Sequence, residues 1–149
     1  MWKVRRGDIM NKKIVVFAPH PDDETFGCGG TIAKKLGEGY KVVVVYMTDG
    51  KHAFSDLFNI NSEPTPDELK EIRKEEARRA ARILGLQEEN LAFLNFEDGR
   101  LKQKQAEAQQ QVIKILSKRL PVCVYFPYEK DIHPDHRATN KIVRSSINK

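Results

Sequence analysis

Two short segments of the sequence gather the residue types that bind metal ions and move protons. The first is HPDDE at residues 20–24, directly after the apolar run KKIVVFAP, and the second is HPDH at residues 133–136. Two imidazoles and one carboxylate make a three-ligand site with an open position, the arrangement of a catalytic zinc ion. Zinc held in this way lowers the pKa of its water to about 7, and a second carboxylate can accept the water's proton.

Each segment also has a structural explanation when it is taken alone. An aspartate after a strand often caps a helix, and Glu24 would be favoured near the positive end of a helix. An isolated HPDH is compatible with a simple proline turn. Two histidines and a carboxylate also suit a non-haem Fe(II) oxygenase, although such a site does not need the second aspartate. The metal interpretation therefore depends on whether the two segments meet.

Apolar runs alternate with helical patterns along the whole chain. Nearly continuous apolar runs are typical of parallel strands that are covered on both faces. TPDE at 65–68 supplies an N-cap threonine, a proline at the first helical position and a glutamate that closes a capping box. The runs are residues 12–19, 41–48, 90–96 and 122–127, and helices are expected from about 30 to 37–39, 65–85, 101–118 and from about 137 to the end.

This alternation predicts an α/β, Rossmann-like three-layer sandwich with a mostly parallel sheet. Right-handed crossovers place the strands in an order of about 3-2-1-4, so that the first and last strands are neighbours. Ligands of such sheets bind beyond the carboxyl ends of the strands at this switch point. The two polar segments follow those two strands, and we expect them to converge there.

Composition restricts the class of protein. A chain of 149 residues is the length of one domain, and we treat residues 1–149 as a single unit in which 1–11 form a flexible tail. No apolar run is long enough for a membrane span. The net charge of +5 is scattered rather than gathered with aromatics on one stripe, which argues against nucleic acid as a partner. Two cysteines, Cys28 and Cys123, are too few for a disulfide framework and favour the cytoplasm.

The paired motifs resemble those of a known family. APHPDDE followed later by HPDHR is similar to the LmbE-like (PIG-L) N-acetylglucosaminyl deacetylases. The resemblance extends to TDG at 48–50, IRKEEARRAARILG at 72–85 and FEDGRL at 96–101, and so covers nearly the whole chain.

The resemblance implies a role for each motif residue. His20, Asp23 and His136 correspond to the family's zinc ligands, although another divalent transition metal is also compatible with them. Asp22 corresponds to the general base that activates the water. The expected reaction is zinc-dependent hydrolysis of the N-acetyl group of a GlcNAc-type sugar or conjugate, which releases acetate and a free amine.

The resemblance also implies supporting roles. His133 would polarise the amide carbonyl as an electrostatic stabiliser or acid, and Asp135 would orient it. Arg73 and Asp98 correspond to family residues that bind substrate, and Glu24 would shape the first loop.

One departure from the family pattern concerns the end of the chain. Family members usually continue beyond HPDHR with further strands and a helix, so the C-terminal part of the family fold is expected to be missing. The last strand would then be an exposed sheet edge, which self-association in a homo-oligomer could cover. The alternative function is a truncated, non-catalytic metal- or sugar-binding module of the same family.

Overall fold

The structure, a computed structural model, describes residues 12–53 and 64–147. The tail predicted at 1–11 lies outside the described residues. In chain order the elements are β1 (Lys13–Ala18), α1 (Asp23–Gly37), β2 (Lys41–Thr48), α3 (Pro66–Ile83), a 3₁₀ turn (Glu88–Asn90), β3 (Leu91–Phe96), a second 3₁₀ turn (Leu101–Lys104), α4 (Gln105–Arg119), β4 (Cys123–Tyr125) and α5 (Pro134–Ser146).

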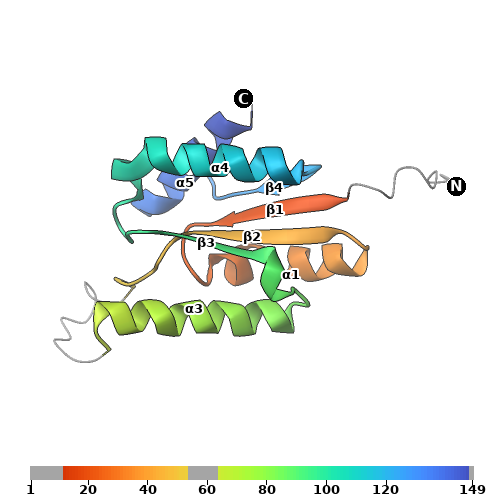
Figure 1. The fold of residues 1–149 in the computed structure, drawn as a ribbon, viewed down its shortest axis with the longest axis horizontal. Helices are drawn as coiled ribbons and strands as arrows, with labels where there is room; N and C mark the ends of the chain where they lie inside the picture. Colours follow the sequence, from red (N-terminus) through yellow and green to blue (C-terminus); the bar gives the residue numbers. More distant parts are fainter. Residues whose placement is uncertain (1–11, 54–63, 148–149) are drawn as a thin grey trace, which may run out of the picture.

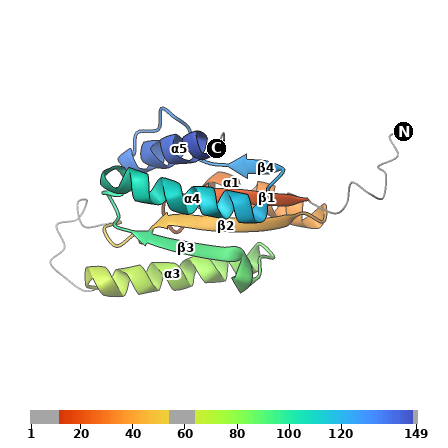
Figure 2. The same cartoon turned by 45° about the horizontal axis from the view of Figure 1, so that its top comes forward.

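The four strands form one parallel sheet in the order β3-β2-β1-β4, which confirms the predicted fold class and strand order. Helices α1 and α3 cover one face of the sheet, and α4 and α5 cover the other (Figures 1 and 2). In the register, Val16 of β1 lies between Val44 of β2 and Tyr125 of β4. The central strand β1 therefore ends beside the end of β4, and the two polar segments follow from these ends.

Alternate side chains of β1 and β2 enter two separate cores. Val15 and Phe17 pack toward α4 and α5, whereas Ile14 and Val16 pack toward α1 and α3. Burial on both faces explains why these strands are continuous apolar runs in the sequence. The two cores hold β1 in place, and β1 carries the first polar segment at its end.

Two helices begin earlier than predicted. Helix α1 starts at Asp23 rather than near Gly30, with Asp23 and Glu24 in a first turn that favours acidic side chains. Gly29 lies inside this helix, and its backbone packs near the side chain of Leu84, since an added Cβ there would meet Leu84 Cδ2 at 3.7 Å. Packing against the end of α3 thus outweighs the poor helix propensity of glycine.

Helix α5 starts at Pro134 rather than near Arg137. His133 occupies the N-cap position, and its side chain accepts a hydrogen bond from the backbone of Asp135. Proline at the first helical position is favourable because its missing N–H has no partner to lose. The capping box predicted at Thr65 and Glu68 is present at the start of α3.

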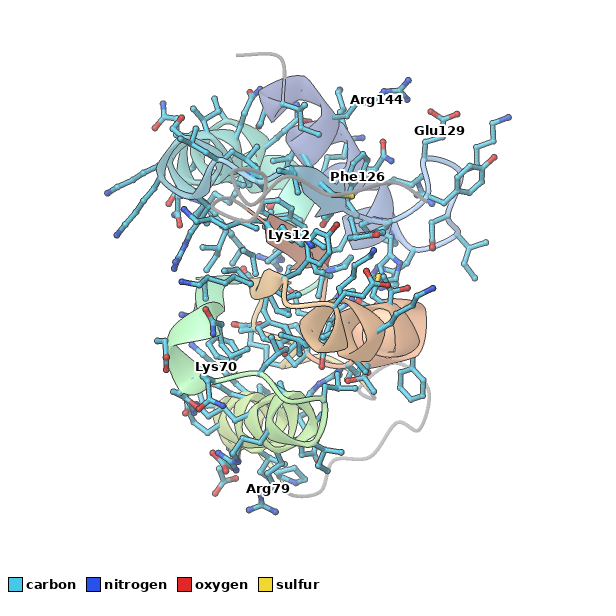
Figure 3. The ribbon with its side chains drawn as sticks, turned by 90° about the vertical axis from the view of Figure 1, so that its right-hand side faces the viewer. Lys12, Lys70, Arg79, Phe126, Glu129 and Arg144 are labelled. Atoms are coloured by element: carbon cyan, nitrogen blue, oxygen red, sulfur yellow. The ribbon has the colours of Figure 1, made fainter. Side chains whose placement is uncertain are left out.

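Strand β4 is a short, open edge of the sheet. It has three residues, and all of them pair with β1. Apolar side chains near it are exposed, including Val122 and Tyr128. The loop after β4 is tied to α5 by an ion pair of 2.7 Å between Glu129 and Arg144, which lie side by side in Figure 3. Among the described residues, no helix combines the length and apolar character needed to cross a membrane.

Candidate metal centre and active site

Three histidines meet where β1 and β4 end. His20 follows β1, and His133 and His136 belong to the loop and first turn of α5. The ring centroid of His20 lies 4.7 Å from that of His133 and 5.4 Å from that of His136. The predicted convergence of the two polar segments is therefore present in the structure.

Asp23 joins two of these histidines. Its Oδ2 lies 3.1 Å from Nδ1 of His20 and 3.2 Å from Nε2 of His136. Ligand atoms that share a tetrahedral zinc ion at about 2.0–2.1 Å are separated by about 3.3 Å, so each of these two distances, taken alone, is close to that of a pair of neighbouring ligands. The donor set of two imidazoles and one carboxylate also suits zinc.

Two sets of three side chains in the described part of the chain have donor atoms that all lie within 4.8 Å of one another. One is His20, His133 and His136, and the other is His20, Asp98 and Asp135. The predicted ligand trio is not one of these sets. Asp23 contacts both His20 and His136, but the three donor atoms do not all lie within 4.8 Å of one another, so the side chains must shift to hold one ion together. His20 belongs to both sets and is the centre of the cluster.

Carboxylates dominate the electrostatics of the site. Burial alone would lower the pKa of His20, but hydrogen bonds with Asp135, Asp23 and Asp98 raise it to about 11. Burial also opposes the ionised form of Asp23, yet hydrogen bonds from His136 and His20 hold the pKa of its carboxyl well below its usual range. The carboxylates of the site therefore favour positively charged groups beside them.

The Nδ1 atoms of His136 and His133 have different partners. Nδ1 of His136 lies 3.1 Å from Oδ2 of Asp131, which fixes the ring and leaves Nε2 facing Asp23. Nδ1 of His133 accepts the backbone N–H of Asp135 at 3.2 Å, so Nε2 carries the hydrogen of the neutral ring. Burial and the nearby His20 lower the pKa of His133, which favours that neutral form.

Asp22 is held from two sides. Its backbone N–H donates to Oε2 of the buried Glu24 at 3.0 Å. Arg73 of α3 donates to Oδ2 of Asp22 at 2.8 Å and to the carbonyl oxygen of Pro21 at 2.6 Å. Burial raises the pKa of the Asp22 carboxyl, and the Arg73 guanidinium acts in the opposite direction. Arg73 thus lies beside the predicted base rather than alone in a substrate pocket.

Gly50 makes room for Arg73. It follows β2 with φ of +66°, and a Cβ there would lie 3.0 Å from both Nε of Arg73 and Cδ of Pro21. A glycine at this position satisfies both the backbone conformation and the close approach.

Asp98 and Asp135 lie on the other side of His20. Oδ1 of Asp98 is 3.1 Å from Nε2 of His20, and Oδ2 of Asp135 is 3.3 Å from the same nitrogen. The carboxylate of Asp135 also accepts the backbone N–H groups of Gly99 and Leu101. Asp135 contacts His133 through its backbone N–H, which donates to Nδ1 of that ring.

Sequence reasoning missed two of these supporting residues. Asp131 orients His136, and its signal was an acidic residue just before HPDH. Gly50 stood in the recognised TDG segment, but only the fold shows that α3 brings Arg73 against it.

Two cavities border the cluster. One of about 470 Å³ lies between α1 and the loop after β4 and includes Asp23, Asp131 and His136 in its lining. The other, of about 320 Å³, lies between α1 and α3 and includes Asp22 and Arg73. Either side of the cluster is therefore open to a small molecule.

Comparison with known proteins identifies the family. The PIG-L family profile, described as GlcNAc-PI de-N-acetylase, matches residues 15–147. The chain belongs to the PIG-L family. The diacetylchitobiose deacetylase of Thermococcus kodakarensis is 36% identical over 131 residues, which are 85% of this chain and 45% of that protein.

Solved structures of two similar proteins show the same fold. N,N'-diacetylchitobiose deacetylase from Pyrococcus horikoshii matches with a TM-score of 0.79 and 34% identity, over 93% of this chain and 50% of that one. GalB, a 4-carboxy-2-hydroxymuconate hydratase from Pseudomonas putida, matches with a TM-score of 0.78 and 25% identity, over 91% of this chain and 55% of that one. The chain spans about half the length of these relatives, which differ in the reaction they catalyse.

Proposed function

We propose that this chain hydrolyses the N-acetyl group of a GlcNAc-type sugar or conjugate, with zinc as its cofactor, and releases acetate and a free amine. Family membership and the similarity to diacetylchitobiose deacetylases support the substrate class. The observation that carries the proposal is the position of Asp23 between His20 and His136, with Asp22 adjacent in the sequence.

His20, Asp23 and His136 would hold the zinc ion. When bound, zinc supplies Lewis acidity and lowers the pKa of a water molecule. Asp22 would accept the proton of the attacking water and pass it to the leaving amine, as a general base and then a general acid. Arg73 and Glu24 keep Asp22 in place for these transfers through the contacts described above.

His133 would stabilise the oxygen of the acetyl carbonyl as negative charge develops on it. The backbone N–H of Asp135 occupies Nδ1 of His133, so the hydrogen on Nε2 is available for donation. Loss of such a donor typically costs about 2.7–4 kcal/mol of barrier, or roughly 10²–10³ in rate. Arg73, the predicted substrate ligand, lines the cavity between α1 and α3, where a sugar could reach it.

Acetate release from N,N'-diacetylchitobiose by the zinc-loaded full chain tests the proposal. We expect Asp22→Asn to lower the rate by roughly 10²-fold or more, because an amide cannot accept the proton. Asp67→Asn, the same substitution at an exposed position in the first turn of α3, is the matched control and should keep the wild-type rate. An undiminished rate in Asp22→Asn would refute the proposed base.

Two other outcomes point to different functions. Zinc binding without hydrolysis of any acetylated sugar would favour a non-catalytic metal- or sugar-binding module. Hydration of an unsaturated acid without acetate release would favour the type of reaction for which GalB is named. The assay therefore separates the deacetylase from both alternatives.

We also propose a cytoplasmic location and a second copy of the chain as a partner. Cys28 and Cys123 are both free thiols, as expected in a reducing compartment. The open edge of β4 and the exposed side chain of Val122 favour association of two copies over an interaction with nucleic acid.

A further inference from the structure

The two ring nitrogens of His20 face different groups. Nδ1 is directed at Asp23, in the predicted ligand set. Nε2 is directed at the carboxylates of Asp98, 3.1 Å away, and Asp135, 3.3 Å away. The side chains of Asp98 and Asp135 are only 8% and 1% exposed, so the contacts form away from water.

The state of the imidazole decides whether it can bind a metal ion. A neutral imidazole carries its hydrogen on one nitrogen and has a free lone pair on the other. Carboxylates are acceptors only, and Asp23 also faces Nδ1. A metal ion shared with Asp23 would replace the hydrogen on Nδ1, whereas Asp98 and Asp135 would keep the hydrogen on Nε2. The lone pair is then on Nδ1, where Asp23 and His136 provide the other ligands.

We infer that Asp98 is a positioning residue for the metal centre, which fixes the tautomer and orientation of His20, with Asp135 as a second partner. This inference rests on the proposed function, because it assumes that His20 binds zinc. Outer carboxylates that accept the hydrogen of a ligating histidine are a common means of orienting the ring and raising its basicity.

The contacts of Asp98 favour this role over the predicted contact with sugar hydroxyls. Oδ1 faces His20, and Oδ2 accepts the backbone N–H of His52 at 3.0 Å. Both oxygens of a nearly buried carboxylate are thus occupied within the protein. A sugar hydroxyl would have to displace one of these partners.

The two carboxylates are themselves fixed by backbone groups. The N–H of Asp98 donates to Oδ1 of Asp49, directly after β2, at 3.2 Å. The N–H of Gly99, after β3, donates to Oδ2 of Asp135 at 2.7 Å, and that of Leu101 donates to Oδ1 at 3.2 Å. Loops after β2 and β3 and the first turn of α5 therefore all contribute to the orientation of His20.

The same three side chains could be read as a separate cation site, since their donor atoms are clustered. A cation there would need the lone pair of Nε2, and the hydrogen of His20 would then move to Nδ1. Nδ1 could no longer serve as a ligand beside Asp23. The two arrangements exclude each other, so the tautomer of His20 distinguishes between them.

Zinc affinity of the full chain, measured by competition with a chelator, tests the inference. In Asp98→Asn, the amide oxygen can still accept the N–H of His52, but its NH₂ group then faces Nε2 of His20. This arrangement favours a hydrogen on Nδ1, and we expect the zinc affinity to fall by about 10–100-fold. Glu97→Gln is the matched control, because it removes a negative charge from the neighbouring residue. Glu97 forms partly exposed ion pairs with Lys51 and Arg100.

Nitrogen-15 NMR of the His20 ring in the zinc-loaded wild-type chain gives a second readout that needs no variant. We expect a metal-bound Nδ1 and a protonated Nε2. The reverse assignment, or equal zinc affinity in Asp98→Asn and wild type, would overturn the inference. An equal loss of zinc affinity in Glu97→Gln would also overturn the inference. The loss of one negative charge near the site would then explain the lower affinity of Asp98→Asn. A wild-type chain that binds no zinc would instead remove the proposed function.

Discussion

Asp22 has a backbone conformation that few residues other than glycine adopt. Its φ is 138°, and the residue is followed at once by the first turn of α1. Such conformations cost about 1–3 kcal/mol and persist only where surrounding contacts fix them. The carboxylate of Glu24 and the guanidinium of Arg73 supply those contacts. The strain at this position lies on the residue that we propose as the base, which is where functional strain is usually found.

Gly50→Ala tests the packing behind this base. A Cβ at residue 50 would press on Arg73 and Pro21 and would be strained by the positive φ. We expect the free energy of unfolding to fall by about 1–3 kcal/mol in chemical denaturation. Acetate release should fall by roughly tenfold or more, because Arg73 would move away from Asp22.

Gly39→Ala is the control for that substitution. Gly39 also has a positive φ, of +80°, but an added Cβ would meet no atom of the described residues within 4 Å. It should cost about 1 kcal/mol of stability through the backbone alone and leave acetate release unchanged. Equal losses of activity in both variants would contradict the role given to Gly50.

At the scale of elements, α3 is the helix that carries Arg73 to the site. Oγ1 of Thr65 accepts the N–H of Glu68, and Oε2 of Glu68 accepts the N–H of Thr65 at 2.8 Å. Thr65→Ala removes half of this capping box. We expect it to lower the free energy of unfolding by about 1 kcal/mol, measured by denaturant titration, and to leave zinc affinity unchanged.

Thr65→Ser keeps the capping oxygen and serves as the control. It should retain nearly all of the wild-type stability, since serine caps helices at least as well as threonine. A loss in Thr65→Ser as large as that in Thr65→Ala would show that the methyl group, rather than the cap, matters.

The elements were largely predictable because their signals are local. Buried parallel strands produce apolar runs, and the segment TPDE at residues 65–68 predicts the start of a helix. The start of α1 was not predictable in the same way, because glycines at 27, 29 and 30 argue locally against a helix. Gly29 and Ile32 are buried in this helix, and Ile32 belongs to the same core cluster as residues of α3 and β2, which are distant in the chain. Tertiary packing of this kind overrides local propensity.

The site was predictable in part for the same reason. Strand order places HPDDE beside HPDH, so the meeting of His20 with His136 followed from topology. The partners of Asp98 and Asp135 did not follow, because contacts of buried side chains depend on rotamers and loop paths. The sequence therefore predicted the cluster, but not which carboxylate faces which nitrogen.

At the scale of the molecule, a bound metal ion should stabilise the fold. An ion that binds only the folded chain adds about 2.7 kcal/mol at a free concentration of 100 times its Kd. We expect zinc to raise the thermal midpoint of the wild-type chain and a chelator to reverse the change. His136→Ala removes one of the three proposed ligands and should abolish most of the shift. Persistence of the full shift in that variant would exclude His136 as a ligand.

The position of β1 in the sheet has a consequence for folding during synthesis. Among the four strands of the described sheet, β1 is made first, yet one of its two neighbours, β4, is made last. His20 and Asp135 are 115 residues apart in the chain, so closing this contact carries a large entropic cost and comes late. A nascent chain cannot assemble the cluster until α5 has left the ribosome, so metal uptake would follow the synthesis of α5.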